Sequence, residues 1–188
     1  MAVGIPREHP LNRLFANLTA ENFAEHLGWP DPEVIEYISD VLMDFVHVNQ
    51  LYKIRNTQGR RVEEVAEMLA EGDLFHRAQS VEREREVHRH IGNYTLFMAG
   101  IFPEFLRRLK TSKVVVSADA LLDFIQVGKR SYRIVSEFTY GSYRPEAPLF
   151  RKLSENFELC VYGLGYVRAD LDRLRDPRFQ ALKGRLLG

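Results

Sequence analysis

The histidine at position 90 is the residue whose surroundings in the sequence best suit chemistry. It lies in the run VEREREVHRHIGNYTLFMAGIF, whose composition is that of a long helix. On such a helix His90 shares an apolar stripe with Tyr94, and Glu86 lies one turn earlier, at the spacing where side chains meet. Asn93 lies at the margin of the same face. A buried histidine paired with a carboxylate has a fixed tautomer and can act as a base or bind a ligand. The predicted ligand-binding site therefore consists of Glu86, His90, Asn93 and Tyr94.

Two other interpretations of His90 stay open at this point. A core histidine that hydrogen-bonds a neighbouring helix has the same sequence pattern and serves only packing. Metal binding requires ligands from other helices, because His88 lies about 160° away from His90 around the helix axis. A di-iron carboxylate site needs Glu-x-x-His steps on two helices, and the sequence contains none. We therefore predict neither a metal site nor a cofactor.

Glycines inside the predicted helices permit a close approach of another helix or of a flat ligand. Gly163 and Gly165 lie in one predicted helix, Gly92 and Gly100 in another, and Gly128 in a third. Each costs about 1 kcal/mol relative to alanine, so packing or binding must favour it. Close helix crossing is the ordinary interpretation, and haem binding is the alternative.

Nucleophilic and nucleotide chemistry find no support in the sequence. It contains no Gly-x-Ser-x-Gly elbow, no P-loop and no Gly-x-Gly-x-x-Gly motif. The one cysteine, Cys160, occupies an apolar position in a helical pattern and is expected to be a small buried hydrophobe. A single cysteine also excludes an internal disulfide and a cysteine-rich zinc site.

The charges of the chain balance overall but are unevenly distributed along it. The 188 residues include 26 basic and 26 acidic side chains. Residues 1–102 contain 10 basic and 16 acidic side chains, whereas residues 103–188 contain 16 basic and 10 acidic ones. This asymmetry predicts either that the two halves pack on each other or that copies of the chain associate. The absence of a net basic charge argues against nucleic-acid and membrane-surface binding, and no apolar run approaches the roughly 18 residues of a membrane helix.

A basic cluster is the predicted contact between copies of the chain. It consists of Lys129, Arg130 and Arg133, which lie on the polar face of a helix expected over residues 118–140. An acidic face of a second copy would complement this cluster. Binding of an anion is a further alternative. We therefore expect a homo-oligomer or a protein partner.

Apolar spacing predicts an all-α protein built as an irregular bundle of about four long helices with several short ones. Asp31 is the expected N-cap of one helix, with Pro32 in its first position, and Thr19 and Ser117 are expected N-caps of two others. No segment alternates as a strand does, although residues 114–116 allow a short extended segment. The long helices are expected over residues 32–53, 80–103, 118–140 and 148–174, and the short ones over 19–28, 62–70 and from 177.

The clearest pattern occupies the last long helix. Eight apolar residues from Phe150 to Leu174 recur at alternating three- and four-residue steps, which predicts a continuous seam helix. The combination of HRHIGNYTLFMAGIFPEFL, GKRSYRIVSEF and this seam resembles a group of bacterial helical proteins of unknown function. The resemblance spans nearly the whole chain. It implies an all-helical bacterial cytoplasmic protein, and it carries over neither an activity nor functional residues.

These observations predict a single helical domain over residues 1–188, in which residues 1–30 are a lead-in segment packed on the bundle. The N-terminal sequence lacks an apolar signal core, so a cytoplasmic location is expected. The leading functional hypothesis is a non-enzymatic interaction or scaffold protein that self-associates. The alternative is a small-molecule, metal- or haem-binding bundle centred on His90 and Glu86, a class that includes enzymes.

Overall fold

The computed structural model describes residues 10–56, 58–73, 80–109 and 120–187. Within these ranges the chain is helical and has no β-strand, which confirms the all-α class predicted from the sequence. The predictions for Ser117 and for residues 114–116 concern residues outside the described ranges. The helices are α1 (Pro10–Glu25), α2 (Pro32–Phe45), α3 (Val48–Leu51), α4 (Val65–Gly72), α5 (Val81–Ile101), α6 (Pro103–Leu109), α7 (Ala120–Ser136), η1 (a 3-10 turn, Gly141–Tyr143), α8 (Ala147–Glu155), α9 (Phe157–Leu174) and α10 (Pro177–Leu187).

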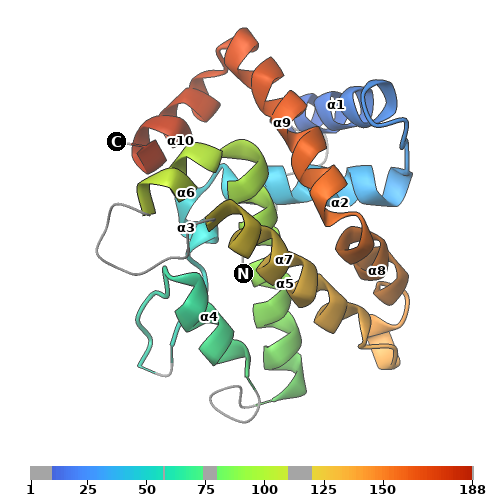
Figure 1. The fold of residues 1–188 in the computed structure, drawn as a ribbon, viewed down its shortest axis with the longest axis vertical. Coiled ribbons are helices and arrows are strands. Elements are labelled where there is room, and N and C mark those ends of the chain that lie inside the picture. The colour runs from blue at the N-terminus through green and yellow to red at the C-terminus, as the bar shows by residue number, and fades with distance from the viewer. Residues whose placement is uncertain (1–9, 57, 74–79, 110–119, 188) are drawn as a thin grey trace.

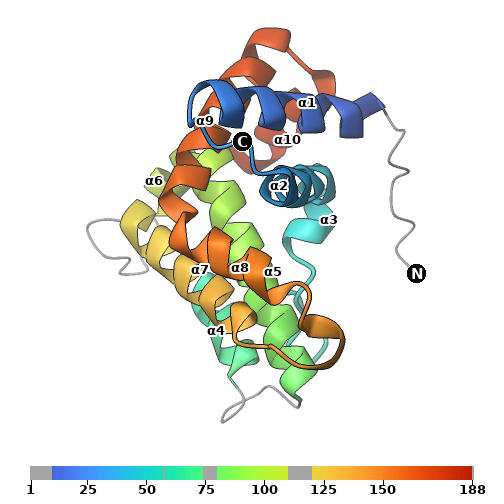
Figure 2. The same ribbon diagram turned by 90° about the vertical axis from the view of Figure 1, so that its right-hand side faces the viewer.

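Helix α5 runs through the centre of the molecule and packs against most of the other helices (Figure 1). Its most extensive contacts are with α7 and α9. Helices α1 and α2 pack together at one end of the molecule, whereas α4 lies against α5 at the other end (Figure 2). The segment from His90 to Ile101 is buried on all sides, because charged residues give way to apolar ones along α5.

Local capping explains where two of the helices begin. Asp31 accepts a hydrogen bond from the backbone N–H of Glu33 at 3.1 Å, and Pro32 occupies the first turn of α2, as predicted. Ser80 Oγ accepts from the backbone N–H of Arg83 at 3.1 Å and caps α5 in the same way.

The predicted helix boundaries at Thr19 and near residue 53 are wrong. Thr19 is not an N-cap but lies inside α1, because Leu11 and Phe15 pack into the core and extend that helix back to its start. The helix that begins at Pro32 ends at Phe45 rather than near residue 53, because His47 adopts an extended conformation at φ −94° and ψ 108°. The chain then starts a separate short helix, α3.

The predicted seam helix is divided into α8 and α9 at Asn156. The side-chain amide of Asn156 donates a hydrogen bond to the carbonyl of Lys152 at 2.9 Å, and the backbone of Asn156 leaves the helical region at φ −114° and ψ 27°. Such a local side-chain bond competes with the continuing helix. The burial of the seam agrees with the sequence pattern, since seven of its eight positions are buried within the chain and only Leu174 is 54% exposed.

Glycines in the helices allow close helix crossing. A Cβ atom added to Gly163 would lie 2.5 Å from Phe23 Cε2 and 2.8 Å from Leu27 Cδ1, so the N-terminal segment can approach α9 only where the side chain is missing. Gly165 has no such neighbour. Helix packing thus accounts for Gly163 without a flat ligand such as haem. The same close approach to a neighbouring side chain is found at Gly92, Gly100 and Gly128.

Candidate functional site

His90, the centre of the predicted site, is a core histidine held by the backbone of another segment. It is 0% exposed, and its Nε2 donates a hydrogen bond to the carbonyl oxygen of Leu51 at 3.0 Å. The rings of Phe45 and Tyr94 pack beside it. Burial lowers the pKa of His90 to about 3, and nearby Lys53 acts in the same direction, so the ring is neutral at pH 7. His90 thereby fixes α3 against α5.

Glu86, the predicted partner of His90, lies in solvent instead. Its side chain is exposed and forms an ion pair with Arg83 at 3.3 Å. Burying a carboxylate beside the apolar core would cost more than leaving it in water. Because the Leu51 carbonyl already accepts from His90, the ring does not need a carboxylate partner. The predicted Glu86–His90 pair is therefore wrong.

Asn93 joins three helices through its side-chain oxygen. This oxygen accepts hydrogen bonds from the hydroxyl groups of Tyr37 on α2 at 2.7 Å and Tyr132 on α7 at 2.9 Å. Tyr94 is buried on another side of α5, where its ring lies 6.2 Å from that of Tyr52, centroid to centroid. In the described structure the four predicted ligand residues thus have different surroundings.

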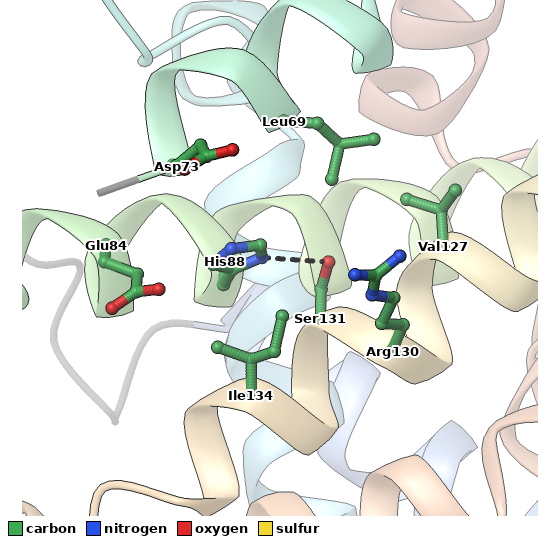
Figure 3. Close-up of a pocket in the computed structure, with 9 residues that line it drawn as sticks. Leu69, Asp73, Glu84, His88, Val127, Arg130, Ser131 and Ile134 are labelled. Carbon is green, nitrogen blue, oxygen red and sulfur yellow. Dashed lines mark hydrogen bonds between the residues drawn. The ribbon is translucent and has the colours of Figure 1, made fainter. Parts of the chain in front are cut away.

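A pocket of about 390 Å³ lies between α4, α5 and α7 (Figure 3). This volume falls in the lower part of the range of small-molecule sites, about 300–1,000 Å³. Leu69 of α4 and Val127 and Ile134 of α7 supply its apolar surface. Its polar groups come from all three sides and surround a histidine that was not part of the predicted site.

His88 of α5 and Ser131 of α7 form the centre of this pocket. His88 Nδ1 lies 3.3 Å from Ser131 Oγ, within hydrogen-bond distance, and the two residues are 7% and 1% exposed. Burial lowers the pKa of His88 to about 4, with Arg130 acting in the same direction and Asp73 opposing it. A Cβ atom on Gly72 would lie 3.3 Å from His88 Nε2, so a glycine allows the end of α4 to lie against the ring. The pocket therefore contains a neutral imidazole at pH 7.

Charges of opposite sign lie on the two sides of this histidine and serine. Figure 3 shows Asp73 and Glu84 on one side of His88, and Arg130 on the other side, beyond Ser131. Burial raises the pKa of Glu84, and the neighbouring Asp73 carboxylate adds to the rise. Within the described ranges neither Glu84 nor Arg130 forms an ion pair. The pocket thus presents separated negative and positive groups.

The three basic residues of the predicted interface on α7 lie in three different environments. Lys129 pairs with Glu158 of α9 at 2.8 Å, and Arg133 lies 3.9 Å from Glu137 of its own helix. Arg130 lines the pocket. Lys129 therefore contributes to packing within the chain, and the predicted self-association stays a prediction.

Neither His88 nor Ser131 belongs to the site predicted from the sequence. Ser131 falls on the spacing Phe124, Gly128, Ser131 and Val135, which is the buried face of α7. A hydroxyl on a buried face needs a partner, and this is the signal that identifies Ser131. His88 gives no comparable signal, because α4 buries it from a distant part of the sequence.

The described part of the chain meets neither the requirements of metal binding nor those of thiol chemistry. No group of three or more His, Cys, Asp or Glu side chains there could hold a metal ion. Cys160 is buried, and burial raises the pKa of its thiol to about 12, in agreement with a packing role. No described helix combines the length and apolar character needed to cross a lipid bilayer.

A second groove, of about 510 Å³, lies between α1 and α2. Its hydroxyl group, on Ser39, donates to the carbonyl of Ile35 in its own helix at 2.7 Å. Two of its other lining residues, Ala16 and Ala20, carry only methyl side chains. The Ser39 hydroxyl is therefore used within α2, whereas His88 and Ser131 lie within hydrogen-bond distance of each other across two helices.

No family model matches the chain, and no match is found among the curated proteins or the solved structures.

Proposed function

We propose that the protein binds a small polar molecule in the pocket between α4, α5 and α7. The observation that carries this proposal is the buried pair of His88 and Ser131, 3.3 Å apart at a pocket of about 390 Å³. Packing alone gives little reason for such a pair, because a buried polar contact adds only a modest net stability. An apolar pocket with a few convergent polar groups and a shifted pKa is typical of small-molecule sites.

Binding fits this arrangement better than nucleophilic catalysis. Serine and histidine are the residue types of an activated nucleophile and its base, but a reaction also needs donors for the developing oxyanion. Ser131 lies inside α7, where backbone N–H groups are used by the helix itself. His88 and Ser131 therefore supply a polar part of the pocket lining rather than a base and a nucleophile.

Self-association has less support from the fold than from the sequence. Seven of the eight seam positions are buried inside the chain, with Leu174 as the exception, so the seam offers little surface for contact with a second copy. Native mass spectrometry on tag-free protein tests this hypothesis separately. Multiples of 21.9 kDa would support it, and a lone monomer across micromolar concentrations would contradict it.

The proposed binding is tested by recording ¹H–¹⁵N correlation spectra with a set of small fragments of every charge class. We expect fragments to shift the amides of Val127, Ser131 and Ile134. Val127→Trp fills the pocket and is expected to abolish these shifts, whereas Gln126→Trp, on the exposed side of the same helix, is expected to retain them. If Val127→Trp does not fold, Leu69→Trp fills the pocket from α4. Fragments that all leave the pocket amides unchanged, or shifts that persist in a folded filled variant, would overturn the proposal.

A further inference from the structure

The acidic side of the pocket is suited to a positively charged group. Glu84 lines this side from α5, and Asp73 lines it from the end of α4. Burial, then Asp73 and then Glu137 raise the pKa of Glu84, so its carboxylate lies in an unfavourable, negatively charged environment. A ligand ammonium group beside Glu84 would offset both the burial and the repulsion.

The opposite side is suited to a negatively charged group. Arg130 lines the pocket there, and no carboxylate in the described ranges pairs with it. The other two basic residues of this face, Lys129 and Arg133, each have an acidic partner. A guanidinium group binds a carboxylate through paired N–H bonds, so Arg130 is the group available for a ligand carboxylate.

His88 and Ser131 lie between these charges, within a single, partly apolar pocket of about 390 Å³. Glu84 and His88 lie one turn apart on α5, about 6 Å along its axis, and Arg130 is adjacent to Ser131 in α7. His88 is neutral at pH 7 and adds no charge between them. Leu69, on the α4 side of the pocket, offers contact to an aliphatic group. Opposite charges on one small molecule match this distribution.

We infer that the pocket binds a small zwitterion, an aliphatic α-amino acid, with its ammonium group at Glu84 and its carboxylate at Arg130 (Figure 3). The inference rests on the proposed binding function and names the class of ligand. A cation alone would leave Arg130, and an anion alone would leave Glu84, without an oppositely charged partner among the described residues. A zwitterion pairs with both and keeps the pocket close to its original net charge.

Three probes of nearly equal shape test the inference. L-leucine carries both charges, 3-methylbutylamine has the same aliphatic chain with the ammonium alone, and 4-methylpentanoate has it with the carboxylate alone. Dissociation constants come from the shifts of the pocket amides at pH 7.5. Because a hydrogen-bonded charge pair is the element that each half-probe lacks, we expect L-leucine to bind at least about tenfold more tightly than either.

Charge-neutralising variants assign each end of the ligand. Arg130→Gln is expected to weaken L-leucine and 4-methylpentanoate by about tenfold and to leave 3-methylbutylamine unchanged. Glu84→Gln is expected to weaken L-leucine and 3-methylbutylamine and to leave 4-methylpentanoate unchanged. Arg133→Gln and Glu82→Gln are the controls, because they make the same charge changes at exposed positions of the same helices.

The outcomes separate the ligand class from the binding function. A half-probe that binds as tightly as L-leucine, or equal effects of the pocket and control variants, would overturn the zwitterion inference. Pocket shifts with neutral fragments but none with L-leucine would also overturn it, while the proposed binding function would stand. Unchanged pocket amides with every fragment and probe would overturn both.

Discussion

His88 Nδ1 on α5 and Ser131 Oγ on α7 lie 3.3 Å apart and join the two helices at the pocket. Because both side chains are buried, removing the hydroxyl leaves the ring nitrogen without this partner. Ser131→Ala is therefore expected to lower the free energy of unfolding by about 1–2 kcal/mol. Urea denaturation at pH 7.5 measures the change.

Ser136 provides a matched control for this variant. Its hydroxyl donates to the carbonyl of Arg133 within the same helix, at 2.6 Å. Ser136→Ala is expected to change the free energy of unfolding by less than about 0.5 kcal/mol, because alanine compensates through its higher helix propensity. Equal losses for the two serine variants would contradict a specific role of the His88–Ser131 contact.

The two buried histidines are expected to make the fold sensitive to acid. The pKa of His88 is about 4 and that of His90 about 3, both below the ordinary value of about 6.5. The unfolded chain therefore binds protons more readily, so stability is full above pH 6.5 and falls as the pH drops toward 4. Lowering the pH from 7.5 to 5.0 is expected to reduce the free energy of unfolding by about 2 kcal/mol for each of these histidines.

His88→Gln isolates one of the two contributions, since glutamine keeps a hydrogen-bonding group but does not titrate. We expect urea denaturation of this variant to show a loss between pH 7.5 and pH 5.0 that is smaller by about 2 kcal/mol than in the natural sequence. A loss of the same size in both proteins would show that His88 takes up its proton as readily in the folded chain as in the unfolded chain.

Local spacing explains which parts of the fold could be predicted from the sequence. The burial of the seam from Phe150 to Leu171 could be predicted because it requires only apolar residues at three- and four-residue steps. This spacing buries the same residues whether or not the helix is continuous. The Asp31 cap is equally local. The break at Asn156 is different, because a seam pattern does not indicate whether an amide side chain will bond a carbonyl four residues earlier.

The candidate site depends on contacts that local spacing does not encode. His90 bonds a backbone carbonyl, that of Leu51, and every residue has a carbonyl, so no residue type marks the partner. Glu86 has the right spacing to meet His90 but remains in water with Arg83. His88 becomes part of a pocket only because α4 returns to cover it. A histidine near a carboxylate in sequence was therefore insufficient to locate the site.

Asn93 is expected to be a strong stability determinant, because two buried tyrosine hydroxyls share its side-chain oxygen. Asn93→Leu removes this shared acceptor, and with it both hydrogen bonds, and is expected to cost at least about 2 kcal/mol of unfolding free energy. Tyr132→Phe alone is expected to cost about 1 kcal/mol. In the Asn93→Leu background the same tyrosine substitution is expected to cost much less, and a full, additive loss in the double variant would contradict the shared bond.

Gly163 and Gly165, two residues apart on α9, are expected to respond oppositely to alanine. A Cβ atom at Gly163 would press on Phe23 and Leu27, so Gly163→Ala is expected to lower stability by about 1–3 kcal/mol. A Cβ atom at Gly165 meets no other atom within 4 Å, so Gly165→Ala is expected to raise stability by about 0.5–1 kcal/mol through helix propensity. Thermal denaturation of the two variants compares the same chemical change in one helix. Changes of the same sign would contradict the close contact between α9 and the N-terminal segment. They would instead favour the alternative that Gly163 allows a flat ligand to approach the helix.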